Sequence, residues 1–140
     1  MINNIYEILN IGNNNIEETI IKCINNTRHD LRNIVQKQRC KIYSSYFSDL
    51  LKKEHITHKI INTLELGYDY DHHFVLVPKD SNCYYLIDLT YSQFETDRFS
   101  ELLDNGYIVV NDAMFSIYLS IVTGKIKENN MDDVYLNIKH

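Results

Sequence analysis

One cysteine, a pair of histidines and one aspartate are of the residue types that acyl transfer through a thioester uses, and they occur in the order Cys…His…Asp. Cys40 comes directly before an amphipathic helical pattern. His72 and His73 open the apolar run HHFVLV, and Asp88 follows the next run, CYYLI. A thiolate attacks a carbonyl carbon, an imidazole carries the proton to the leaving amine, and a carboxylate fixes the imidazole tautomer. These residues predict the Cys-His-Asp triad of a cysteine hydrolase or transferase.

The helix expected after Cys40 makes this thiol the candidate nucleophile. The segment CKIYSSYFSDLL repeats apolar residues at the spacing of one buried helical face. A helix N-terminus presents unpaired N–H groups and the positive end of the helix dipole, which favour a thiolate over a thiol. Cys23 lies instead on the apolar face of an earlier helix, where core packing is expected, and Cys83 borders a turn.

The histidines and Asp88 are expected on two paired strands. The apolar runs on either side of the polar segment PKDSN predict a β-hairpin. Pairing of Val77 with Tyr84 defines one register of this hairpin. In that register His73 lies directly opposite Asp88, with Cβ atoms about 4.5–5.5 Å apart. A connection shorter by one residue puts His72 opposite Asp88 instead, so His73 is the first candidate for the base and His72 the alternative.

Helices are expected in the N-terminal part of the chain. Residues 3–10 predict a short helix that ends at Gly12. Asn15 suits the N-cap of a second helix, whose apolar residues recur as far as Val35. The segment NNTRH within that helix is a weak helix former, so a break there is the alternative.

The remaining elements give the chain a mixed character. The segments THKIINTLEL and YIVV predict strands in addition to the hairpin. One helix is expected to end at Gly106 and another to begin at Asn111 or Asp112, while the polar tail after Gly124 is expected to be loosely ordered. Helices and a small antiparallel sheet in one chain predict a single α+β domain over residues 1–140.

Composition limits the possible partners and cofactors. The net charge of −5 provides no positive field for nucleic acid, and no apolar run is long enough to cross a membrane. The 3 cysteines are odd in number and lack CxxC spacing, so reduced thiols are expected, with no metal and no other cofactor. The N-terminus lacks a signal-peptide pattern, which predicts a cytoplasmic protein or one exported without a classical signal peptide.

These residues resemble a known superfamily. The arrangement is similar to the papain-like superfamily, in which a cysteine opens a helix that packs on a small antiparallel sheet carrying His and then Asp or Asn. The segment HFVLVPKDSNCYYLID resembles the His-to-Asp stretch of arylamine N-acetyltransferases, of transglutaminase-like enzymes and of effector domains that deamidate protein glutamine. The resemblance covers about residues 39–94.

The resemblance implies a papain-like fold and roles for particular residues. Cys40 would be the nucleophile, His73 the base and Asp88 the orienting acid, whereas the transglutaminase-like pattern favours His72 as the base. By similarity to papain-like proteases, Gln36 or Gln38 would help to form an oxyanion hole. The chain has QKQRC where acetyltransferases have Arg-Gly-Gly before the cysteine, so acetyl-CoA chemistry is not implied.

The expected activity is acyl transfer on an amide of a protein or peptide substrate. The substrate would be a glutamine side chain, in deamidation or transamidation, or a peptide bond, in proteolysis. An effector-like enzyme that acts on a partner protein fits the resemblance. The alternative is a non-catalytic binding or regulatory protein on the same fold. The sequence indicates neither the substrate's identity nor the oligomeric state.

Overall fold

The protein has an antiparallel sheet with helices on both faces. The structure is a computed structural model that describes the backbone of residues 2–124 and the side chains of residues 16–124. Within this part, the elements are α1 (Ile2–Asp30), α2 (Cys40–Lys53), β1 (Lys59–Asn62), the 3-10 helix η1 (Thr63–Leu66), β2 (His73–Pro78), β3 (Tyr84–Ile87), the 3-10 helix η2 (Tyr91–Phe94), α3 (Ser100–Asn105), β4 (Tyr107–Val110) and α4 (Asp112–Val122). The predicted α+β class is confirmed.

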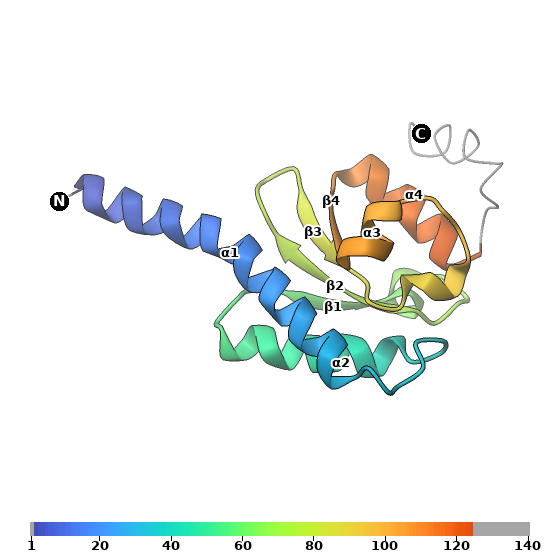
Figure 1. The fold of residues 1–140 in the computed structure, drawn as a ribbon. Coiled ribbons are helices and arrows are strands. Elements are labelled where there is room, and N and C mark those ends of the chain that lie inside the picture. The colour runs from blue at the N-terminus through green and yellow to red at the C-terminus, as the bar shows by residue number, and fades with distance from the viewer. Residues whose placement is uncertain (1, 125–140) are drawn as a thin grey trace.

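The described strands form a meander with the order β1-β2-β3-β4, and each neighbouring pair is antiparallel. Figure 1 shows α1 and α2 on one side of this sheet and α3 and α4 on the other. Because side chains alternate along a strand, Val75 of β2 packs toward α1 and α2, and Phe74 packs in the cluster of α3 and α4. The sheet therefore has a buried core on each face.

Helix α1 joins the two helices that the sequence predicts, but it ends at Asp30 rather than near Val35, which is 74% exposed. It runs without interruption from Ile2 to Asp30, so the expected end at Gly12, the N-cap at Asn15 and the break in NNTRH are wrong. The second half is held by buried residues at helical spacing, which include Cys23 at 2% exposure as expected. Since adding a turn to an existing helix needs no new nucleus, this packed half supports extension toward the N-terminus.

Only part of the segment THKIINTLEL forms the strand that the sequence predicts there. Strand β1 ends at Asn62, whose side chain accepts a hydrogen bond from Leu64 N at 3.0 Å and caps η1. The helix ends expected in the C-terminal part are confirmed. Gly106 is the C-cap of α3, and Asn111 Oδ1 accepts a hydrogen bond from Met114 N at 2.9 Å at the start of α4. The expected loose order after Gly124 lies outside the described residues.

Candidate active site

Cys40 occupies the first position of α2, where the sequence predicts it. No described side chain caps this helix, and its first turn carries no acidic residue. The positive end of the helix dipole is therefore not neutralised by a carboxylate of the first turn. The Cys40 sulfur also accepts a hydrogen bond from the backbone N–H of His73 at 3.4 Å. The half-buried Cys40 sulfur therefore lies at the positive end of the helix dipole and accepts one backbone hydrogen bond.

His72 and Asp88 form a buried pair. His72 Nε2–H donates to Asp88 Oδ2 at 2.7 Å, and the residues are 1% and 3% exposed. Tyr118 OH donates to the same oxygen at 2.6 Å. The other oxygen accepts from Thr90 N at 3.1 Å and from Thr90 Oγ1 at 3.2 Å. These donors hold the carboxylate in one orientation, as a buried charge requires.

The imidazole of His72 is fixed on its other sides as well. Phe94 meets it edge-on, with ring centroids 4.8 Å apart. The backbone N–H of His72 donates to Thr63 Oγ1 at 2.9 Å, and Thr63 N–H donates to His72 O at 3.0 Å. Because Nε2 of His72 bonds to Asp88, Nδ1 is the ring nitrogen that remains available to a second group, and Cys40 contributes to the electrostatic environment of this imidazole.

The pKa of His72 reflects this environment. Burial lowers the pKa of His72, but the charge and hydrogen bond of Asp88, followed by those of Cys40, raise it to about 9. The imidazole is therefore expected to be protonated near neutral pH. A protonated imidazole between a carboxylate and a thiol is suited to stabilise a thiolate and to donate a proton to a leaving amine.

The expected pairing of His73 with Asp88 is wrong. Strand β2 pairs Val77 with Tyr85 rather than Tyr84, which carries Phe74 to the level of Asp88. The shift arises at the turn, where Lys79 N and Asp80 N both donate to Cys83 O, at 3.1 and 3.3 Å. His72 lies on the same face as Phe74 and reaches Asp88 diagonally, a distance that a long side chain spans.

His73 has a different partner. Its Nε2 lies 2.9 Å from Asp71 Oδ1, and its side chain is directed away from the Asp88 face because successive residues alternate. It contributes to the site through its backbone N–H, which donates a hydrogen bond to the Cys40 sulfur. The geometry thus favours the alternative base, His72, over His73.

The two glutamines considered for an oxyanion hole support the loop before Cys40. Gln36 Oε1 accepts a hydrogen bond from Ser92 Oγ, and Gln38 is exposed with a left-handed backbone at φ 61°. The bond to Ser92 directs the Gln36 side chain toward η2. The backbone N–H groups at the start of α2 are better placed to receive an oxyanion.

Gln93 is a residue of this region that the sequence analysis missed. Its Oε1 accepts from Gln38 N at 3.3 Å, and its Nε2 donates to Thr90 Oγ1 at 3.1 Å. Since Thr90 in turn donates to Asp88, Gln93 connects the carboxylate to the segment just before Cys40. Tyr118 and Phe94 were missed too, because their distance in sequence from the histidines gives no signal.

Among the described residues, no group of three or more His, Cys, Asp or Glu is arranged to hold a metal ion. The helices in the described part of the chain include none that is long and apolar enough to cross a membrane. Comparison of the chain with protein-family models, curated proteins and solved structures found no match.

Proposed function

We propose that this protein is a cysteine-dependent acyl-transfer enzyme that acts on an amide of a protein or peptide. Cys40 is the nucleophile, His72 the acid and base, and Asp88 the residue that orients the imidazole. The observation that carries the proposal is the buried 2.7 Å bond from His72 Nε2 to Asp88, which leaves Nδ1 for the thiol at the start of α2.

The proposed reaction has two steps. In the first, the Cys40 thiolate attacks the carbonyl carbon, a C–S bond forms, and the C–N bond breaks as His72 gives its proton to the leaving amine. In the second, the neutral imidazole takes a proton from water or from a second amine. That nucleophile attacks the thioester, and the C–S bond breaks to restore the thiolate. Asp88 stays ionised and stabilises the imidazolium.

The substrate class follows from this chemistry. A glutamine carboxamide would lose ammonia, and water or a lysine amine would then complete deamidation or transamidation. A peptide bond would be cleaved by the same steps. The N–H groups of the uncapped N-terminus of α2 would stabilise the tetrahedral oxyanion in either case.

The test is cysteine alkylation followed separately at each thiol. We expect iodoacetamide to label Cys40 rapidly at pH 6–7 and Cys23, which is 2% exposed, only on unfolding. His72→Gln should slow the labelling of Cys40 strongly, whereas the matched variant His73→Gln should leave it nearly unchanged, because His73 contributes through its backbone.

A second measurement addresses catalysis itself. Mass spectrometry of glutamine-containing peptides incubated with the protein would report deamidation, amine incorporation or cleavage, and Cys40→Ser should abolish each. Slow labelling of Cys40 at the rate of an ordinary thiol, at every pH, would contradict the proposal and favour a binding or regulatory protein.

A further inference from the structure

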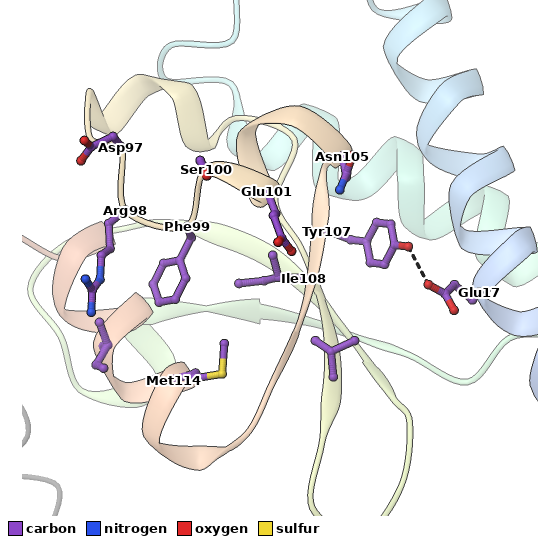
Figure 2. A pocket seen from close by; sticks show the side chains of 12 residues that line it. Glu17, Asp97, Arg98, Phe99, Ser100, Glu101, Asn105, Tyr107, Ile108 and Met114 are labelled. Carbon is purple, nitrogen blue, oxygen red and sulfur yellow. Dashed lines mark hydrogen bonds between the residues drawn. The ribbon is translucent and has the colours of Figure 1, made fainter.

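A second concave region lies on the β4 side of the molecule. It has a volume of about 830 Å³ and is bounded by α3, β4, the start of α4 and Glu17 of α1, as Figure 2 shows. Among its described lining residues there is no member of the proposed triad. Its function is therefore separate from the chemistry at Cys40.

This pocket follows the free edge of the sheet. Among the described strands, β4 pairs with β3 alone and forms one edge. Tyr107, Ile108 and Val109 all line the pocket. Because consecutive side chains on a strand point to opposite faces, a pocket that contacts all of them has to extend along the edge between the faces.

The hydrogen-bond pattern leaves backbone groups available at this edge. Asp88 N–H donates to Gly106 O at 3.1 Å, which makes these residues a hydrogen-bonded pair. Such pairs alternate along an antiparallel ladder, so Ile108 and Val110 bond to β3. Tyr107 and Val109 then direct their N–H and C=O groups outward, where an added strand can bond to them.

The charges around the edge are mainly negative. Glu17, Asp97 and Glu101 line the pocket with a single cationic side chain, that of Arg98. Burial, the hydrogen bond and charge of Glu17, and the charge of Glu101 contribute to raising the pKa of Tyr107 to about 12. A cationic ligand would therefore experience a favourable potential beside β4.

Apolar side chains form the floor of the same region. Phe99, Ile108, Met114 and Ile117 line it. In Figure 2, Phe99 and Met114 lie on the same side as Ile108, and Tyr107 points the other way to Glu17. A strand laid along β4 would thus place alternate side chains against an apolar surface and next to carboxylates.

We propose that β4 binds an extended, basic segment of a partner protein, which adds a strand to the sheet. Backbone hydrogen bonds to Tyr107 and Val109 supply affinity that is independent of sequence. Lysine or arginine side chains next to Glu17 and Glu101, and apolar side chains over Ile108, supply specificity. This interaction is expected whether or not Cys40 is catalytic.

Amide-resolved hydrogen exchange with a synthetic peptide tests the proposal. The probe is a peptide that alternates lysine and valine, and its control has glutamate in place of lysine. In the free protein we expect fast exchange at Tyr107 and Val109 and slow exchange at Ile108 and Val110. At a concentration about ten times Kd, the lysine peptide should slow exchange at Tyr107 and Val109 about tenfold.

Two pairs of variants separate the contribution of backbone hydrogen bonds to peptide binding from the contribution of charge. Val109→Pro removes the outward N–H and should abolish binding, whereas Val109→Ala keeps this N–H and should retain it. Glu101→Lys should weaken binding, and Glu65→Lys, which makes the same charge change at an exposed position of η1, should not. Circular dichroism would establish that each variant folds. If Val109→Pro does not fold, the comparison of Glu101→Lys with Glu65→Lys decides the outcome.

Several results would overturn the proposal. One is equal binding of the lysine and glutamate peptides, and another is unchanged exchange at Tyr107 and Val109. Slow exchange of both amides in the dilute free protein would assign the edge to another segment of this chain. Protection that increases with protein concentration would assign it to a second copy.

Discussion

At the scale of single residues, the charge state of His72 connects the candidate site to stability. The pKa of His72 is about 9 in the folded protein, above its ordinary value of 6.5. A raised pKa in the folded state means that protonation favours folding. This stabilisation of the folded state is complete below pH 6.5 and is lost as the pH rises through 9. Its contribution to the free energy of unfolding is at most roughly 3 kcal/mol.

The corresponding measurement is urea unfolding between pH 6 and pH 10. The free energy of unfolding of the unmodified protein should fall across this range by more than that of His72→Gln. The variant His73→Gln controls for the loss of an imidazole at the neighbouring position. Equal pH dependence in the unmodified protein and in His72→Gln would show that the raised pKa is not present in solution.

Tyr118 offers a second prediction at this scale. Its hydroxyl donates to the buried carboxylate of Asp88, so Tyr118→Phe leaves an ionised group without one of its donors. We expect a loss of about 1.5–3 kcal/mol in the free energy of unfolding. The matched variant Tyr91→Phe loses a bond from its hydroxyl to the carbonyl of Arg98, an uncharged acceptor, and should cost about 0.5–1.5 kcal/mol.

Only one of these tyrosines should affect the candidate site. Tyr118→Phe is expected to change the pH profile of Cys40 alkylation, because it alters the carboxylate that bonds His72. Tyr91→Phe should leave that profile unchanged. A common effect of both variants on the profile would indicate a general loss of packing rather than a role at Asp88.

The sequence was sufficient to choose the cysteine and the aspartate of the candidate site, but not to choose between its two histidines. Cys40 was chosen from its position at the start of a predicted helix and Asp88 from its position after an apolar strand; in the structure Asp88 bonds to His72, and the Cys40 sulfur bonds to the backbone N–H of His73. The choice between His72 and His73 depended on the strand register, and one residue in the turn changes which side chain faces Asp88. Periodicity does not determine the length of a turn.

At the scale of elements, the site depends on how two loops are joined. The loop before α2 and the helix η2 are connected by Gln93 through Gln38 N and Thr90 Oγ1. Cys40, the proposed nucleophile, directly follows the first of these segments, and Asp88 lies shortly before the second. We therefore predict that Gln93 is a positioning residue, whose effect reaches Cys40 and Asp88 through the backbone and through Thr90.

Gln93→Ala should slow Cys40 alkylation about fivefold near neutral pH, the equivalent of roughly 1 kcal/mol for one hydrogen bond. It should also broaden or shift the pH profile, which simple destabilisation would not do. Gln93→Glu keeps an acceptor for Gln38 N and is expected to rescue part of the rate. An unchanged rate and profile in Gln93→Ala would contradict this role.

The elements themselves could largely be predicted. Helix α2, the hairpin, strand β4 and helix α4 follow from strong periodicity and recognisable caps. The full length of α1 and the helix η1 could not be predicted. The extent of α1 reflects tertiary packing and propagation, and η1 depends on a local bond between the side chain of Asn62 and Leu64 N.

At the scale of the whole molecule, the antiparallel sheet brings the proposed triad together. The start of β2 and the end of β3 lie at the same end of the sheet because the two strands run in opposite directions. Helix α2 packs on this sheet with its N-terminus near that end, so the Cys40 sulfur reaches the backbone N–H of His73, next to His72, from a different layer. The partner surface proposed on β4 uses the edge of the same sheet.

Gly106 lies where α1 packs closely against the segment that follows β3. It has φ +82°, and a Cβ atom added there would lie 2.7 Å from Leu89 Cδ2 and 3.0 Å from Ile24 Cγ2. Its carbonyl also accepts the backbone N–H of Asp88. A side chain at this position would therefore push against α1 and against the residue that follows Asp88.

Gly106→Ala is expected to cost about 2–5 kcal/mol, the sum of a left-handed backbone and an overpacked contact. Gly67→Ala is the matched control, since Gly67 has φ +93° but no atom within 4 Å of an added Cβ, and it should cost only about 1–2 kcal/mol. Thermal and urea unfolding would measure both. Gly106→Ala should additionally slow Cys40 alkylation because it displaces Leu89 beside Asp88, whereas Gly67→Ala should not. Equal costs for the two variants would show that the layers around Gly106 relax freely, and would remove the physical link between the packing of α1 and the geometry of the site.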